Sequence, residues 1–363
     1  MTRRPFPAHL VLICGVRPQY IKAAALQYEL QRCSAAPFTT TIIDTAQHFS
    51  PPMNDLLMRE IGLEPTIRLR HPSRSSPAEV LGSTVSQLGN LSSQWPLTTT
   101  VVVFGDANPM LAGALTAKLN GFRLVHVEAG ERRIGGEQES FNSRAADLAA
   151  DLAFCVSASA AEALRAEGFT GQLVRTGDLA ARWFTHMIAP PPAGDRTGDR
   201  TGADANRVMV TLHRPENMNI GTMRQLLTRL LDRGKTVHWI LHPRSAAMVR
   251  RASKELPVVL HEPMGFRQVL RALSDAAFLV SDSGGLIREA HLLGRPALAV
   301  NTAVWTDLHD AGLIRHVGPD LSDLDAGIAW VEQLRGALPP SPLMVPGGID
   351  EGIDALLTLA NRP

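Results

Sequence analysis

Short apolar runs alternate along this chain with longer segments of helical period, and that alternation constrains the fold more than any other feature. Each apolar run is too short for a helix and is followed by a segment long enough for one, which is typical of βα units with parallel strands. The runs that predict strands are residues 9–14, 39–44, 100–104, 124–127, 152–156, 173–176, 208–212, 237–241, 258–260, 277–281 and 297–300.

The alternation is interrupted once. Residues 190–207 contain a near-repeat of GDRT and no buried periodicity, which indicates a linker or surface insertion. A chain of 363 residues also exceeds the usual domain size of roughly 150. We therefore predict an α/β protein with two Rossmann-like domains in tandem and a binding site in the cleft between them. The predicted parts are an N-terminal domain (1–189), the linker (190–207), a C-terminal domain (208–340) and a final segment (341–363) whose helix packs back on the first domain.

Composition excludes several kinds of partner. Thirty-six basic and 35 acidic residues give a net charge of +1, so the chain lacks the positive charge expected of a nucleic-acid or anionic-membrane binder. We find no run near the roughly 20 apolar residues of a membrane span, and the N-terminal apolar stretch is typical of a strand rather than a signal peptide. Three separated cysteines suit a reduced, cytoplasmic protein. The histidines and cysteines show no metal-binding spacing, so no metal is expected.

Two strand ends in the first half carry candidate residues. Gly15 follows the first strand and opens a helix near Pro18, where Arg17 and Lys22 add positive charge suited to a phosphate. The pattern GxGxxG is missing, so no dinucleotide cofactor is expected, and we predict no cofactor at all. After the strand at 100–104 comes Asp106, a carboxylate that either caps the next helix, as Asn108 also could, or takes part in chemistry.

The next strand leads into a charged, glycine-rich loop. Glu128 follows the apolar run directly, and Arg132 and Glu139 come soon after it. Carboxylates that converge near arginines suit proton transfer at a carbon beside a bound phosphate. The alternative is a solvated charged loop, which fits Glu131 and Glu137 better than Glu128.

The second half places polar residues at three strand ends. His213 and Arg214 follow one strand and His242 follows the next. A single histidine after a strand is more often structural, but two at equivalent strand ends strengthen the case for contact with phosphate. After the strand at 277–281, Asp282 and Ser283 are followed by Gly284 and Gly285 at a helix start, with Glu289 further along the helix. Glycines there expose backbone N–H groups to a diphosphate, and a glutamate nearby can accept hydrogen bonds from ribose hydroxyls.

These segments, in this order, resemble the UDP-N-acetylglucosamine 2-epimerase family. The family pattern GTRPExIK is matched by residues 15–22, TGQH by 45–48 and GDTxT by 105–109. HVEAGLR is matched by residues 126–132, HRREN by 213–217 and DSGGxxEE by 282–289. The matches run from Gly15 to about Gly312, with a weaker echo in the last helix, and they favour the branch that does not hydrolyse its substrate.

The resemblance implies a glycosyltransferase-B (GT-B) fold and cofactor-free epimerisation at C2 of a UDP-linked amino sugar, such as UDP-N-acetylglucosamine. In such a reaction UDP is eliminated to leave a glycal and is then added back. It implies catalytic roles for Asp106, Glu128, Glu139 and His213, with Glu139 reached by aligning Asn142. It also implies a homodimer and a ligand-binding set made up of Arg17, Lys22, Arg132, Arg214, His242, Ser283, Gly284, Gly285 and Glu289.

The chain departs from the family pattern on the sugar side of the expected site. Gln19 stands where the family has Glu, Ala107 where it has Thr, Ser143 where it has Arg, and Asn301 where it has Arg. The nucleotide-binding segments depart less, so a specialised UDP-sugar is an open hypothesis. The functional alternatives are a hydrolysing 2-epimerase that releases UDP and free sugar, a GT-B glycosyltransferase, and a nucleotide-sugar binder without turnover.

Overall fold

The computed structural model describes residues 8–33, 38–47, 51–71, 76–132, 137–188, 204–301, 305–334 and 338–362. These fall into two compact units, Met1–Trp183 with Pro342–Pro363 and Phe184–Ser341. The predicted linker lies mostly outside the described residues. Among the helices within the described ranges, none is long and apolar enough to cross a membrane.

The first unit is built on a seven-stranded sheet in the order β3-β2-β1-β4-β5-β6-β7, and every adjacent pair of strands is parallel. Its strands are β1 (Ala8–Cys14), β2 (Phe38–Asp44), β3 (Ile67–Arg68), β4 (Thr100–Phe104), β5 (Arg123–Val127), β6 (Leu152–Cys155) and β7 (Gln172–Arg175). The strand order reverses between β1 and β4. Ligands of doubly wound sheets bind at such a switch point, beyond the carboxyl ends of the strands.

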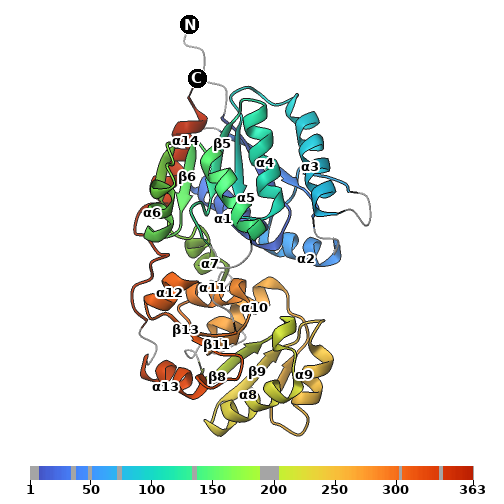
Figure 1. Ribbon diagram of the computed structural model, residues 1–363, viewed down its shortest axis with the longest axis vertical. Coiled ribbons are helices and arrows are strands. Elements are labelled where there is room, and N and C mark those ends of the chain that lie inside the picture. The colour runs from blue at the N-terminus through green and yellow to red at the C-terminus, as the bar shows by residue number, and fades with distance from the viewer. Residues whose placement is uncertain are drawn as a thin grey trace, which may run out of the picture. The chain divides into compact units, whose positions relative to one another are not determined.

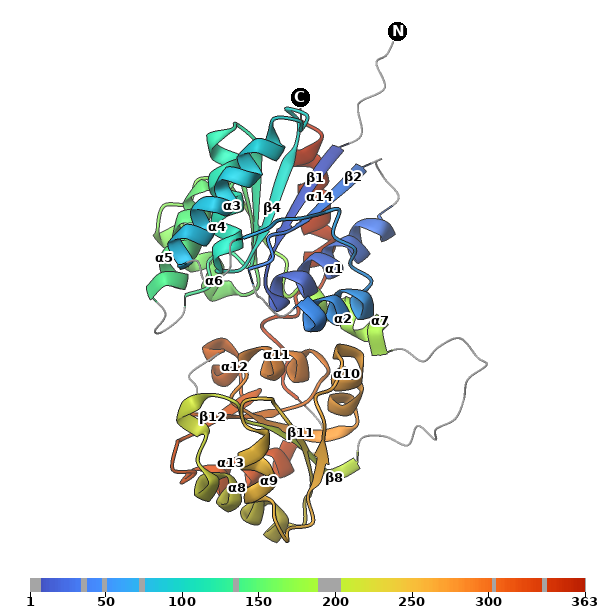
Figure 2. The same ribbon diagram turned by 90° about the vertical axis from the view of Figure 1, so that its right-hand side faces the viewer.

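Helices cover both faces of this sheet. Figure 2 shows α3, α4 and α5 on one face and α1 and α14 on the other. Buried aliphatic side chains of the central strands, such as Val11, Val101 and Val103, pack against α4. The helices of the unit are α1 (Arg17–Arg32), α2 (Pro51–Ile61), α3 (Pro77–Ser92), α4 (Asn108–Leu119), α5 (Glu137–Ala149), α6 (Ala158–Ala166), α7 (Ala180–Ile188), which runs into the second unit, and α14 (Gly348–Ala360).

The second unit repeats the same architecture with six parallel strands in the order β10-β9-β8-β11-β12-β13. Its switch point lies between β8 and β11. The strands are β8 (Asp204–Thr211), β9 (Thr236–Ile240), β10 (Val259–His261), β11 (Ala276–Ser281), β12 (Ala297–Val300) and β13 (Ile314–Val317).

The helices of the second unit also lie on both faces of its sheet. Figure 1 shows α10, α11 and α12 on one side of the sheet, with α8, α9 and α13 on the other. Trp239 is among the largest fully buried side chains of the protein and lies in this unit's core. The helices are the 3₁₀ turn η1 (Pro215–Asn217), α8 (Ile220–Asp232), α9 (Ala246–Ala252), α10 (Phe266–Ser274), α11 (Gly284–Leu292), α12 (Thr306–Asp310) and α13 (Leu324–Leu334).

The predicted α/β class with two Rossmann-like parts is confirmed, because both sheets are parallel and alternate with helices. Two strands of the structure, β3 and β13, were not predicted from the sequence. β3 has two residues, too few for a periodic signal, and β13 reads IRHV, in which polar residues interrupt the apolar run.

Candidate active site

At the switch point of the first unit, Gly15 is fixed by its neighbours. Its backbone N–H donates to Gln19 Oε1 at 2.9 Å, and Gln19 Nε2 donates to the carbonyl of Phe104 at 2.9 Å. A Cβ at Gly15 would lie 2.0 Å from Thr45 Oγ1 and 2.6 Å from Pro109 Cγ. Only glycine fits there, and buried Gln19 joins the end of β1 to the end of β4.

Lys22 lies between two carboxylates. Its Nζ is 2.7 Å from Asp178 Oδ1 and 3.0 Å from Glu128 Oε1, and at most 13% of any of the three side chains is exposed. Asp178 Oδ1 also accepts a hydrogen bond from the N–H of Ala180 at 2.8 Å. A buried lysine between two carboxylates holds both of them in fixed positions through ion pairs.

Glu128 follows β5 in a left-handed backbone conformation, with φ of +67°. Such a conformation is uncommon for a residue with a side chain and occurs where neighbouring contacts enforce it, often at functional sites. Glu128 lies beside the loop after β4, since a Cβ at Gly105 would be 3.6 Å from Glu128 Oε2. Asp106 is the next residue of that loop and is half-buried. The structure thus brings the Asp106 loop and Glu128 together.

Helix α5 closes this edge of the sheet. Buried Asn142 donates from Nδ2 to the carbonyl of Asp106 at 3.1 Å and to Asn108 Oδ1 at 3.0 Å. Glu139 lies one turn earlier on α5 and is half-buried, and its carboxylate forms no hydrogen bond or ion pair with another described residue. Arg17, the first residue of α1, is also half-buried.

Arg132 contacts carboxylates of its own unit. Its Nη1 lies 2.9 Å from Asp147 Oδ2, and its Nε and Nη2 contact the two carboxylate oxygens of Glu167 at 3.0 and 2.6 Å. These contacts indicate that Arg132 secures the loop after Glu128.

In the second unit, the fully buried carboxylate of Asp282 organises the loop after β8. It accepts hydrogen bonds from the backbone N–H groups of His213 and Arg214, the latter at 2.9 Å, and from Asn217 Nδ2 at 2.9 Å. His213 Nδ1 lies 3.0 Å from Asp282 Oδ1. Burial raises the pKa of Asp282, but these hydrogen bonds outweigh it and lower the pKa to about 2.

His213 and His242 follow adjacent strands and stack, with ring centroids 4.9 Å apart. The N–H of Arg244 donates to His242 Nδ1 at 3.2 Å. Burial, the neighbouring His213 and Arg244 together lower the pKa of His242, against a smaller opposing effect of Asp282. The neutral form of His242 is thereby favoured, with Nδ1 accepting and Nε2 carrying the proton.

Helix α11 begins with the serine and glycines that the sequence analysis proposed as a diphosphate site. Ser283 is its N-cap and accepts a hydrogen bond from the N–H of Leu286 at 3.4 Å. Gly284 and Gly285 form the first turn, and an added Cβ at Gly285 would meet no atom closer than 4.0 Å. Trp305 Nε1 donates to the carbonyl of Gly284 at 2.7 Å, and Glu289 is buried further along the helix.

Two buried acids and one amide at these edges were not predicted as site residues: Asp147, Asp178 and Asn217. Asp178 had a signal in the sequence, because Gly177-Asp178 follows a strand just as Gly105-Asp106 does, and both glycines have a positive φ. Asp147 lies inside α5, where no local pattern distinguishes it from a surface acid. His48, the last residue of the TGQH match, lies outside the described residues.

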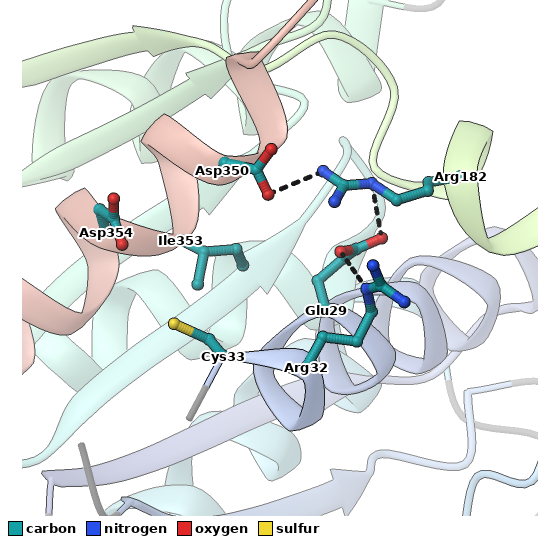
Figure 3. A pocket seen from close by; sticks show the side chains of 7 residues that line it. All are labelled: Glu29, Arg32, Cys33, Arg182, Asp350, Ile353 and Asp354. Atoms are coloured by element: carbon teal, nitrogen blue, oxygen red, sulfur yellow. Dashed lines mark hydrogen bonds and ion pairs between the residues drawn. The ribbon is translucent and has the colours of Figure 1, made fainter. Parts of the chain in front are cut away.

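The cavity in Figure 3 is separate from these motifs. It measures about 200 Å³, lies in the first unit and is lined by Glu29, Arg32, Cys33, Arg182, Asp350, Ile353 and Asp354, none of which is a candidate site residue. Within the part of the chain that the structure describes, no group of three or more His, Cys, Asp or Glu side chains could hold a metal ion.

The family model described as UDP-N-acetylglucosamine 2-epimerase matches residues 31–338. The chain belongs to this family. The resemblance inferred from the motifs is thereby confirmed, and the protein is a member of a family of isomerases.

Curated relatives of this epimerase support the assignment at modest identity. The UDP-2,3-diacetamido-2,3-dideoxy-D-glucuronate 2-epimerase of Pseudomonas aeruginosa is 26% identical over 323 residues, which cover 84% of this chain and 86% of the relative. The UDP-N-acetylglucosamine 2-epimerase of Bacillus subtilis is 25% identical, covering 86% of this chain and 83% of the relative.

Solved structures share the epimerase fold. The UDP-N-acetylglucosamine 2-epimerase of Neisseria meningitidis, solved with UDP-N-acetylglucosamine bound, matches with a TM-score of 0.76 at 21% identity, covering 96% of this chain and all of the other. A UDP-glucosyltransferase of Polygonum tinctorium matches less well, with a TM-score of 0.62 at 11% identity over 99% of this chain and all of the other. At these identities, both matches show the fold alone.

Proposed function

We propose that this protein epimerises C2 of a UDP-linked amino sugar, as in the conversion of UDP-N-acetylglucosamine to UDP-N-acetylmannosamine, through elimination and re-addition of UDP. One observation carries the proposal most directly. In a chain of the 2-epimerase family, Glu128 is held in a strained conformation beside Lys22 and next to the loop after β4, at the edge where such sheets bind ligands.

The chemistry needs a base, an acid and a stabilised leaving group. A carboxylate takes the C2 proton, the C–H electron pair forms the C1–C2 double bond, and the C1–O bond breaks with its electrons leaving on UDP. Addition of UDP to C1 and of a proton to the other face of C2 gives the epimer, so atoms and charge balance. We assign proton transfer to Asp106, Glu128 and Glu139 as a group and give His213 a part in stabilising the leaving diphosphate.

UDP binding is assigned chiefly to the second unit. The helix start at Ser283, Gly284 and Gly285 offers N–H and hydroxyl donors to the diphosphate, His213, Arg214 and His242 contact the phosphates, and Glu289 faces the ribose. Arg17 adds a cation from the first unit. Lys22 and Arg132 were expected at the nucleotide, but their carboxylate partners favour a role in holding Glu128 and Asp147.

The test is isotope exchange in deuterated water. Incubation with UDP-N-acetylglucosamine, and with UDP-linked diacetamido sugars, should introduce deuterium at C2 and yield two epimers by NMR, with no free UDP beyond a trace. Free UDP accumulating with turnover would favour a hydrolysing 2-epimerase, and release only with an acceptor would favour a glycosyltransferase. Binding of a nucleotide sugar without deuterium exchange at C2 would favour a nucleotide-sugar binder without turnover.

The departures from the family pattern support a specialised sugar. Asn301, where the family has Arg, donates to Asn217 Oδ1 at 3.0 Å, and Asn217 in turn contacts Asp282. A neutral amide at this position would no longer attract an anionic or strongly polar group as arginine does. The exchange assay with a panel of UDP-sugars tests this directly, and preference for UDP-N-acetylglucosamine over every other sugar would contradict it.

We also propose that the protein is a cytoplasmic homodimer. Support comes from the family resemblance and from three cysteines that remain free in the structure. Light scattering at micromolar concentration should give twice the chain mass of 39.2 kDa. Fractionation of the source cells should place the protein in the cytoplasm.

A further inference from the structure

The residues on both sides of Glu128 contact one carboxylate, that of Asp147 on α5: His126 through its side chain and Gly130 through its backbone N–H. On one side, His126 Nδ1 lies 2.7 Å from Asp147 Oδ1. On the other, the N–H of Gly130 lies 3.3 Å from each oxygen of the same carboxylate. Glu128, midway between these two residues, is the one with φ of +67°. These contacts of Asp147 with His126 and Gly130, which we call the clamp, therefore lie on both sides of the strained residue.

The clamp also reaches the loop that carries Asp106. His126 Nε2 lies 2.8 Å from the carbonyl oxygen of Gly105, and the N–H of Gly105 donates to the carbonyl of Val127 at 2.9 Å. The His126 ring thus has an acceptor at each nitrogen and bridges α5 to the end of β4. Asp147, through this ring, fixes the spacing of the two loops on which Asp106 and Glu128 lie.

Asp147 is buried yet charged. Burial raises its pKa, but hydrogen bonding and charge from His126 and from Arg132 outweigh that effect and lower the pKa overall. Arg132 is itself held by Glu167, so the positive charge beside Asp147 has a fixed position. A fixed anion with several donors directed at it is rigid, because moving it would break all of these contacts together.

We propose that Asp147 is a positioning residue for the epimerisation, which holds Glu128 in its reactive orientation without touching the substrate. The inference rests on the proposed function. Displacing a reacting group by about 1 Å can reduce a rate about a hundredfold while substrate binding elsewhere is unchanged. Loss of the clamp should therefore lower kcat and leave the KM and the affinity for UDP nearly unchanged, since UDP is assigned chiefly to the second unit.

The experiment compares Asp147→Asn with the wild type and with Asp151→Asn in the C2 deuterium-exchange assay. Asp151 lies just after α5, pairs with Lys118 at 2.9 Å and accepts a hydrogen bond from the backbone N–H of Leu124 at 2.7 Å. The amide oxygen of Asn can still accept that hydrogen bond, so Asp151→Asn is the control for loss of one carboxylate charge near α5. We expect kcat to fall about tenfold to a hundredfold in Asp147→Asn, with KM and UDP affinity within about twofold, and Asp151→Asn to match the wild type. A kcat within twofold of the wild type would overturn the inference.

A double variant separates positioning from general loss of structure. If Asp147 acts through Glu128, Asp147→Asn should cost almost nothing further in a Glu128→Gln background. A full additional loss there would show that Asp147 only stabilises the fold and would overturn the inference. No exchange by the wild type with any UDP-sugar would refute the proposed function, and this inference with it, whereas exchange by the wild type and an unaffected Asp147→Asn refutes the inference alone.

Should Asp147→Asn fail to fold, Asp147→Glu is the second variant. It keeps the negative charge but moves the carboxylate by one methylene, with folding checked by circular dichroism and Tm. A lowered kcat with an unchanged UDP affinity supports the clamp, and a wild-type kcat contradicts it.

Discussion

At the scale of single residues, the carboxylate of Asp282 links stability to pH. Its pKa in the folded protein, about 2, lies below the ordinary value of 3.8, so the charged form stabilises the fold above pH 3.8 and that contribution disappears as the pH falls toward 2. The shift corresponds to about 2 kcal/mol. In urea unfolding at several pH values, Asp282→Asn should be at least that much less stable at pH 7. The deficit should shrink between pH 4 and pH 2, and a deficit independent of pH would contradict this account.

Gln19 gives a second prediction at this scale. Its amide accepts from Gly15 and donates to the carbonyl of Phe104, a pairing that a carboxylate cannot make with both groups. Gln19→Glu, which restores the family's residue, should lower the free energy of unfolding by about 1–3 kcal/mol because the Phe104 carbonyl then faces an anion. Gln27→Glu, a half-buried position on the same helix, is the control. Equal stability of the two variants would show that another group compensates.

Candidate site residues could be predicted from the sequence where they follow a strand. They could not be predicted where they lie within a helix and contact residues distant in the chain. Gly15, Asp106, Glu128 and His213 follow apolar runs, and the structure places all four at carboxyl edges of the sheets. Asp147 lies within α5, and its importance comes from contacts with residues 15 or more positions away. The sequence predicts Lys22 as a cation for the nucleotide. Its two carboxylate partners, Glu128 and Asp178, follow β5 and β7, and local sequence cannot place those strand ends beside α1.

At the scale of elements, α14 completes the first unit from the far end of the chain. It packs against β1, β5, β6 and β7, with Leu356 fully buried. Leu356→Ala should destabilise the first unit by about 2–5 kcal/mol, because it removes buried methyl groups and leaves a cavity. Thr358→Ala, exposed on the same helix, should have no measurable effect. Thermal unfolding followed by calorimetry checks this, and a lower transition temperature for the second unit alone would contradict it.

Helices could be predicted from the sequence where their apolar residues recur with helical period. The helix predicted in the final segment 341–363 is α14 (Gly348–Ala360), because its buried positions recur every three to four residues. The sequence predicts no helix at α5 and places Glu137 and Glu139 in a charged loop, since the helix opens with EQES and its exposed side carries Phe141 and Leu148. Its buried side holds polar Asn142 and Asp147, so the usual contrast between an apolar and a polar face is missing. A helix that buries polar residues near a candidate site is therefore harder to predict from the sequence than a helix that buries only apolar residues.

At the scale of the whole molecule, the proposed function divides chemistry and nucleotide binding between two units, and the six strands of the second sheet follow the order of β3-β2-β1-β4-β5-β6 in the first. Each sheet presents its candidate residues where the order reverses: Gly15 and Asp106 after β1 and β4, His213 and Asp282 after β8 and β11. The sequence predicted this division because its strand ends are marked by polar residues. It could not predict the order of the strands, which depends on pairing between segments distant in the chain.

This division predicts that binding and turnover can be separated by substitution. Glu128→Gln keeps the size of the side chain but removes the carboxylate, so C2 exchange should fall more than a hundredfold, whereas calorimetric titration should give a UDP affinity within about twofold of the wild type. His213→Asn should weaken UDP binding about tenfold, because the group that Asp282 orients is lost. If Glu128→Gln weakened UDP as much as His213→Asn, the first unit would have to contribute directly to the nucleotide, and the assignment of binding chiefly to the second unit would be wrong.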